Sequence, residues 1–189
     1  MIFDWRATKI VPALPTIIEN LAKAQREFLF AADEVSAEQW KLCPGEGRWS
    51  AAEVVAHVIM VERAIVRSTD KLLQKPPAPL PFFKRWHIPM VMVESRWIRR
   101  KSPIPLDPQM VGPKEEMLAQ VREVRGRSLA FLEETKGRNL SKYHWPHPFL
   151  GMLNGYEWFQ MIASHQLRHT KQMKEISADL PKIVTTLQK

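Results

Sequence analysis

Apolar residues recur every three or four positions along four long stretches of the chain, which is the spacing of amphipathic helices. The stretches cover residues 12–34, 50–73, 113–136 and 154–178. No segment alternates between apolar and polar residues convincingly enough to predict a strand. Because helices with apolar stripes bury those stripes against one another, the pattern predicts an all-α protein built as a four-helix bundle.

Local signals mark the ends of these helices. "SAAE", from Ser50 to Glu53, predicts a capping box in which each residue bonds the backbone amide of the other. Pro15 suits the first turn of the first helix, and Gly137 suits the end of the third. Pro181 lies beyond the expected end of the fourth helix, so the last residues read as a loosely held tail.

Two segments interrupt the helical pattern. Residues 75–113 are rich in proline at both ends, in "KPPAPLP" and "SPIPLDPQMVGP", which excludes a continuous helix. They predict a long proline-rich crossover, or insertion, between the second and third helices. Within it, four apolar residues at helical spacing predict a short amphipathic helix: Trp86, Met90, Val93 and Trp97. Residues 138–153 read as an irregular connection.

Length and composition narrow the class of protein. A chain of 189 residues is expected to form a single domain, over residues 1–189. Its one cysteine, Cys43, cannot form an internal disulfide, fits a reducing compartment and is interpreted as structural. The N-terminus carries Asp4 and no apolar run like a signal peptide, and no segment holds about 18 consecutive apolar residues. We therefore expect a soluble, cytoplasmic protein.

The net charge of +8 is concentrated in one segment. Residues 84–101, "KRWHIPMVMVESRWIRRK", hold six Lys or Arg and one Glu, a net of +5. Such a basic helix with two tryptophans suits contact with a membrane surface, but it can equally pack on the bundle or on a second subunit. We prefer packing. No nucleic-acid-binding motif accompanies the patch, so no nucleic-acid partner is expected.

Three histidines lie on stripes that should face the core. His165 and His169 are four residues apart and share a face with the apolar residues of the fourth helix. His57 lies on the stripe of the second helix, together with Val54, Val61, Ala64 and Ile65. If both stripes face the interior of the bundle, the three imidazoles converge between the second and fourth helices.

Two interpretations of the three rings remain open at this point. They can be ordinary core histidines with hydrogen-bond partners, or they can bind a divalent cation, which would satisfy all three at once. Three imidazoles with an open coordination position are typical of a catalytic metal site. The residues between the pair are "QLR", so the HExxH motif and its general-base glutamate are missing.

Three polar residues near this stripe are candidates to support the site. Gln172, one turn after His169, can orient that ring or a bound ligand. Arg168 and Glu157 lie near the edges of the stripe. For each of the three, an ordinary interhelical or solvent contact is the alternative.

Two stretches together resemble the DinB/YfiT-like superfamily, near its DinB-like branch. "RWSAAEVVAHV" has a Trp-Ser start and a histidine seven residues later, and "HPFLGMLNGYEWFQMIASHQLRHTKQM" has HP-x-x-G followed by His-x-x-Arg-His-x-x-Gln. The resemblance covers residues 12–178 except 75–113. The matching positions are Trp49, Ser50, His57, His147, Pro148, Gly151, His165, Arg168, His169 and Gln172.

The resemblance implies a four-helix bundle that holds a divalent metal, zinc or nickel, on His57, His165 and His169. It also implies a homodimer and a small-molecule substrate. His144 and His147 are not expected to be ligands, and His87 belongs to the insertion. We expect a metal-dependent enzyme, such as a low-molecular-weight-thiol S-transferase. A metal-dependent hydrolase and a non-enzymatic metal-binding stress protein are the alternatives. In an enzyme, the cation would lower the pKa of water or of a substrate thiol.

Overall fold

A computed structural model describes residues 13–78, 80–81, 93–94 and 110–187. Within these ranges the predicted four-helix bundle is confirmed. A short 3₁₀ helix and two strands precede the last helix. In chain order, the elements are α1 (Leu14–Asp33), α2 (Ala51–Leu73), α3 (Lys114–Glu134), η4 (Leu140–Lys142), β1 (His144–His147), β2 (Gly151–Asn154) and α4 (Gly155–Leu187).

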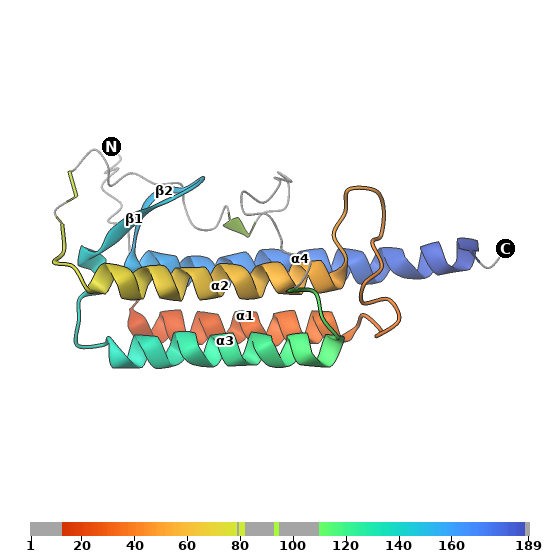
Figure 1. Cartoon of the computed structure of the whole chain (residues 1–189), viewed down its shortest axis with the longest axis horizontal. Helices are drawn as coiled ribbons and strands as arrows, with labels where there is room; N and C mark the ends of the chain where they lie inside the picture. Colours follow the sequence, from red (N-terminus) through yellow and green to blue (C-terminus); the bar gives the residue numbers. More distant parts are fainter. Residues whose placement is uncertain (1–12, 79, 82–92, 95–109, 188–189) are drawn as a thin grey trace, which may run out of the picture.

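The four helices run in two directions. Helices α1 and α4 run one way and lie along each other, whereas α2 and α3 run the opposite way and are also neighbours (Figure 1). Because α2 ends at one end of the bundle and α3 begins at the other, the chain between them must return along the whole bundle. This is the predicted long crossover. The short helix expected around Trp86, Met90 and Trp97 falls outside the described residues, as do His87 and most of the basic segment.

Capping boxes fix the starts of the two helices that carry the histidines. At α2, the Ser50 side chain accepts from the amide of Glu53, and Glu53 Oε2 accepts from the amide of Ser50 at 2.8 Å, as predicted. At α4, Asn154 Oδ1 accepts from the amide of Glu157 at 3.1 Å, and Glu157 Oε2 accepts from that of Asn154 at 2.8 Å. Both helices therefore begin at a defined residue.

The connection expected to be irregular is in part a β-hairpin, so that prediction is wrong. Strands β1 and β2 pair antiparallel, with Trp145 opposite Leu153 and His147 opposite Gly151. Gly151 has a φ of +92°, a conformation that a residue with a side chain rarely adopts. Leu153 is fully buried, so the hairpin is anchored in the bundle. Each strand has four residues, and β1 contains Pro146, which leaves too short a pattern to reveal a strand period.

The end predicted for the fourth helix is also wrong, because α4 continues through Pro181 to Leu187. A proline removes one backbone hydrogen bond from a helix but does not by itself end it. The preceding turns are anchored by Met173, Ile176 and Leu180, each at most 1% exposed, so the helix direction is set before the proline is reached. None of the described helices combines the length and apolarity needed to cross a membrane.

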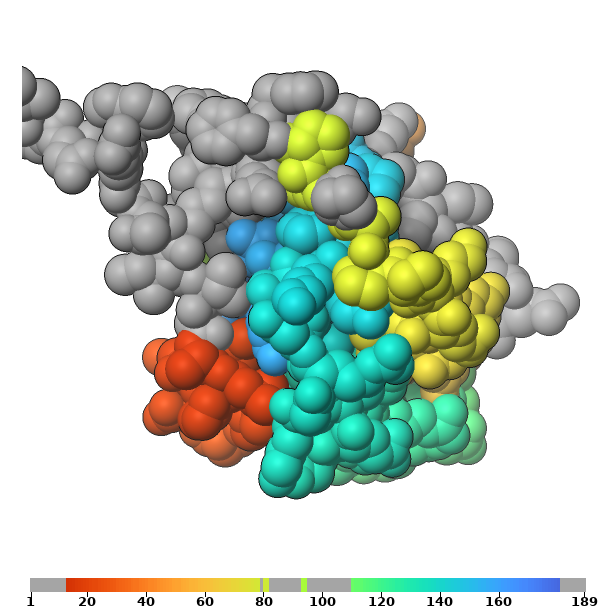
Figure 2. Space-filling view, turned by 90° about the vertical axis from the view of Figure 1, so that its left-hand side faces the viewer, coloured from red at the N-terminus to blue at the C-terminus, as the bar shows by residue number. Residues whose placement is uncertain are grey.

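The end of the bundle at which α2 and α3 finish is closed by contacts between chain segments. Figure 2 looks onto this end, where the chain leaving α2, in yellow, lies against the connection after α3, in cyan. Arg138 Nη2 donates to the carbonyl of Leu73 at 2.9 Å, and its guanidinium lies 5.8 Å from the ring centroid of Tyr143. These contacts fix the base from which the hairpin extends.

A polar cluster is buried in the core between α2, α3 and α4. Arg125 donates to both carboxylate oxygens of Glu62, through Nε at 2.8 Å and Nη2 at 2.9 Å. Ser128 Oγ donates to Glu62 Oε1 at 2.6 Å, and Arg125 Nη2 also donates to Gln166 Oε1 at 2.8 Å. Arg125 Nη1 donates to the carbonyl of Leu21 in α1. Each of these four polar side chains is at most 1% exposed, so the cluster joins all four helices without solvent.

Candidate metal centre

The three predicted histidines meet between α2 and α4. His57 Nε2 lies 3.2 Å from His165 Nε2, and His169 Nε2 lies 3.1 Å from the same atom. All three candidate ligand atoms lie within 4.8 Å of one another. The rings of His57 and His169 are buried, each 6% exposed, and that of His165 is partly exposed. The convergence that the two sequence stripes predict is therefore present in the fold.

The spacing of the three nitrogens fits a divalent first-row cation. An imidazole nitrogen lies about 2.0–2.1 Å from a bound zinc ion, so two such ligands at a tetrahedral angle lie roughly 3.3 Å apart. The separations of 3.2 and 3.1 Å are close to this value. Three ligands also leave at least one coordination position for another molecule.

Hydrogen bonds alone do not satisfy these rings. Gln172 Oε1 lies 2.9 Å from Nδ1 of His169, so that nitrogen donates and Nε2 keeps its lone pair. Nε2 of His165 has two histidine neighbours but at most one hydrogen to donate. Within the described residues, the buried Nδ1 of His57 has no partner. A cation bound to the three Nε2 atoms would use the lone pairs that remain.

The protein environment keeps two of the rings neutral. Burial lowers the pKa of His57 to about 4. Burial is also the main reason that the pKa of His165 is well below its usual value, and the positive charges of His169, His57 and Arg168 lower it further. Since only the neutral imidazole binds a metal, protons compete little for these two ligands at pH 7.

Residues outside the two helices border the cluster. The indole of Trp49, just before α2, lies 5.1 Å from the ring of His57, centroid to centroid. Glu94 of the crossover lies against α4: its Oε1 accepts from Ser164 Oγ at 3.0 Å, and its carbonyl accepts from Lys171 Nζ at 3.1 Å. The crossover therefore contacts α4 at residues that neighbour His165 in sequence.

The other predicted supporting residues lie around the cluster. Arg168 Nη1 is 3.5 Å from the carbonyl of Val93, beside the crossover. Glu157 caps the start of α4, eight residues before His165, or about 12 Å along the helix. His144 and His147 lie on β1 and are not part of the three-histidine cluster.

Cys43 is exposed, and its surroundings do not activate the thiol. Burial and the negative charge of Glu53 raise its pKa, and its sulfur lies 3.8 Å from the Glu53 carboxylate. A raised pKa lowers the fraction of reactive thiolate. The geometry agrees with its interpretation as a structural residue.

Sequence reasoning predicts one contribution in part and misses another. Packing of the crossover on the bundle agrees with Val93, which packs against the core, but its spacing gives no signal that it contacts Arg168 of α4. The hairpin next to α4 was missed, although "HPFLG" places a histidine, a proline and a glycine within five residues, which is a signal for a turn.

Comparison with known proteins agrees with the fold and with the resemblance seen in the sequence. The family model described as "DinB superfamily" matches residues 20–173. A curated relative, "Uncharacterized protein YuaE" of Bacillus subtilis strain 168, is 28% identical over 146 residues, which cover 75% of this chain and 85% of the relative.

Two solved structures share the fold. One, a four-helix bundle protein named TT2238, matches with a TM-score of 0.56 and 20% identity over 86% of this chain and 99% of its own. The other, YfiT from Bacillus subtilis, matches with a TM-score of 0.62 and 15% identity over 89% of this chain and 87% of its own. YfiT is described as a probable metal-dependent hydrolase with an unusual four-helix bundle topology.

Proposed function

The chain belongs to the DinB superfamily, and from this premise we propose that it is a metal-dependent enzyme. Its divalent cation, zinc or nickel, is held by His57, His165 and His169. The observation that carries this proposal is the convergence of three Nε2 atoms, in which those of His57 and His169 lie 3.2 and 3.1 Å from that of His165.

The reaction that we propose is transfer of a low-molecular-weight thiol to a small electrophile. A bound cation supplies Lewis-acid chemistry, which lowers the pKa of a thiol or of water. A free thiol needs only a small shift from its usual pKa of about 8.5 to ionise at pH 7, whereas water starts near 15.7. In the described part of the chain no carboxylate joins the three histidines, so a nucleophile that needs little help from a general base fits the site better.

The chain's own residues have defined tasks in this proposal. Gln172 holds His169 so that Nε2 faces the cation, and Trp49 packs against His57. Helices α2 and α4, each started by a capping box, hold the ligands at matching heights.

Metal-dependent hydrolysis of a substrate is the second candidate reaction. It is favoured by the structural likeness to YfiT, a probable metal-dependent hydrolase. The two reactions differ in the nucleophile. The purified protein is assayed for conjugation of 1-chloro-2,4-dinitrobenzene to a panel of small thiols and for hydrolysis of 4-nitrophenyl acetate. Metal-dependent conjugation supports transfer, and metal-dependent ester cleavage alone favours hydrolysis. Metal binding with turnover in neither assay favours the non-enzymatic alternative.

Elemental analysis tests the site itself. We expect about one zinc or nickel ion per chain in the purified protein and a large loss in His57→Ala. Equal metal content in the two proteins would show that these histidines do not form the site. His144→Ala is the matched control, since it removes a histidine that is not part of the cluster, and it should keep the metal.

A further inference from the structure

His147, in the hairpin, has one ring nitrogen committed to the backbone. The amides of Phe149 and Leu150 lie 3.1 and 3.2 Å from its Nδ1 and donate to it. A nitrogen that accepts two hydrogen bonds carries no hydrogen, so the hydrogen of the neutral ring is on Nε2. The turn of the hairpin therefore selects one tautomer of His147.

The ring is held firmly and stays neutral. It lies 5.1 Å from the ring of Trp158 in α4, centroid to centroid. Trp158 in turn stacks on Trp145 at 4.9 Å with an interplanar angle of 5°, and its Nε1 donates to the Trp145 carbonyl at 3.3 Å. Burial lowers the pKa of His147 to about 4, so the ring is uncharged at pH 7.

The remaining nitrogen is available to another molecule. Both hydrogen bonds of His147 use Nδ1, and none joins its Nε2 to the described residues. Since Nε2 is also not a buried unpartnered atom, it is open to solvent. The ring therefore presents an N–H donor with no partner of its own among those residues. A rigid neutral donor of this kind is the group that proteins use to bind a carbonyl oxygen or to stabilise a developing negative charge.

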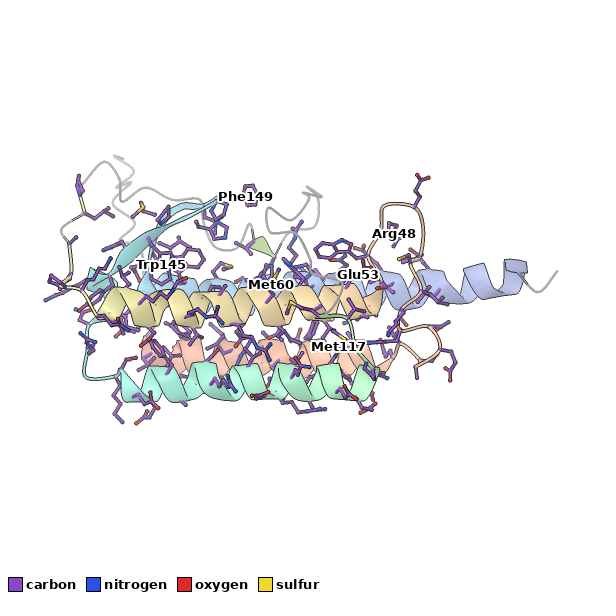
Figure 3. All side chains as sticks on the ribbon, viewed as in Figure 1. Arg48, Glu53, Met60, Met117, Trp145 and Phe149 are labelled. Carbon is purple, nitrogen blue, oxygen red and sulfur yellow. The ribbon has the colours of Figure 1, made fainter. Side chains whose placement is uncertain are left out.

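This donor packs on the same face of α4 as the three-histidine cluster, about two helical turns before it. Trp158, on which the ring packs, precedes His165 by seven residues, which places both on the same face of α4. The hairpin extends over the bundle and ends at the turn marked by Phe149 (Figure 3).

We propose that Nε2–H of His147 donates a hydrogen bond to an oxygen of the substrate bound at the three-histidine centre. The substrate class that this selects carries a carbonyl or anionic oxygen next to the atom that reacts. This proposal rests on the function proposed above. It gives the hairpin a role in substrate binding, in addition to its role in connecting α3 to α4.

A purely structural role for His147 would be to cap the turn, and a matched pair of variants separates the two roles. In His147→Asn, the side-chain oxygen can still accept from the amides of residues 149 and 150, as asparagine does in turns, but the distal N–H is lost. In His147→Gln, an amide N–H can reach the position of Nε2. His144→Asn makes the same substitution at the start of the same strand and serves as the control.

The probe is azide binding to the cobalt-loaded protein, followed in the visible spectrum of the metal. Azide on the cation presents a terminal nitrogen that stands in for the substrate oxygen as a hydrogen-bond acceptor. We expect His147→Asn to keep its cobalt and to bind azide roughly five-fold more weakly, the effect of one hydrogen bond. His147→Gln should lie closer to the wild type, and His144→Asn should equal it. Near-UV circular dichroism of the stacked tryptophans reports whether the hairpin is intact.

The outcomes separate this inference from the proposed function. If wild-type protein takes up no cobalt, the proposed function fails, and the inference fails with it. If wild type and His147→Asn hold equal cobalt and bind azide equally, the metal centre stands and the role of His147 is wrong. If His147→Asn loses the tryptophan signal, His147→Gln decides: retained azide affinity supports the donor, and lost affinity with intact cobalt overturns it.

Discussion

The two buried polar clusters of this bundle differ in how completely they satisfy themselves. In the cluster of Glu62, Arg125, Ser128 and Gln166, both carboxylate oxygens accept hydrogen bonds and the arginine has four acceptor contacts. Among the described residues, one of its atoms, Gln166 Nε2, has no partner. In the three-histidine cluster, the Nε2 atoms face one another with fewer hydrogens than contacts.

The comparison is direct because α2 and α4 contribute residues to both clusters. On α2, His57 and Glu62 are five residues apart, and on α4, His165 and Gln166 are adjacent. Helix geometry turns neighbouring side chains by about 100°, so one turn of α4 serves both. A polar cluster whose charges are paired inside the protein holds the helices together, whereas ring nitrogens that face one another suit a ligand from outside.

Breaking the cluster of Glu62, Arg125, Ser128 and Gln166 should have the largest effect on stability. Arg125→Ala leaves the Glu62 carboxylate buried without its charge partner, and we expect the free energy of unfolding to fall by about 3–5 kcal/mol. Urea denaturation at pH 7 measures it. The double variant Glu62→Leu/Arg125→Met should lose less than Arg125→Ala, since no unpaired charge remains. A loss below about 1 kcal/mol for Arg125→Ala would mean that water or another group replaces the arginine.

Binding of zinc to the three-histidine cluster should have the next largest effect on stability. Zinc at a hundred times its dissociation constant should raise the free energy of unfolding by about 2.7 kcal/mol. The gain should disappear on addition of a chelator and should be absent in His169→Ala. Denaturation curves with and without zinc measure it, and an equal gain in His169→Ala would place the zinc elsewhere.

Removing the hydrogen-bond partner of His169 should have a smaller effect, which is expected on metal affinity. Gln172→Ala removes the acceptor on Nδ1 of His169, at 2.9 Å, and should lower metal affinity by about 10- to 100-fold. Competition with a coloured chelator gives the affinity. Gln172→Glu keeps an acceptor at this position and should bind metal more tightly than Gln172→Ala. Equal affinities in wild type and Gln172→Ala would make the contact incidental.

Removing the cap of α4, which lies outside both clusters, should have the smallest effect. Asn154→Ala removes the side-chain cap of α4 and should cost about 1 kcal/mol of stability. Metal affinity should stay within about two-fold of wild type, because the cap contacts neither cluster. Thermal melting and the same chelator competition measure the two quantities, and Asn154→Asp should preserve both. A large fall in metal affinity would show that the start of α4 helps to set the position of His165.

The sequence predicts the helices and the histidine cluster because both follow from one rule, the period of the buried stripe. Met161, Ile162 and Met173 are buried as the period requires, and the histidines share their face. The same rule also misleads. Ala64, expected on the buried stripe of α2, is exposed, while Glu62 is buried. A charged residue is assigned to solvent from sequence unless its partner is known, and Arg125 lies 63 residues away.

Other features depend on contacts that no local pattern contains. The hairpin is stabilised by pairing across a turn and by the stacking of Trp145 on Trp158, and α4 passes Pro181 because Leu180 and Ile176 are already buried. The position of Glu94 against Ser164 joins residues 70 apart. The expected homodimer and the thiol partner stay predictions.

The direction of the helices has a consequence for how the site comes into being. His57 and His165 are separated by 108 residues, and the chain between them includes the long return that brings α3 parallel to α2. Loops of this length close slowly relative to local helix formation. A newly made chain therefore brings its three histidines together only when its last helix has docked. Uptake of metal during refolding would time the final assembly step of the bundle.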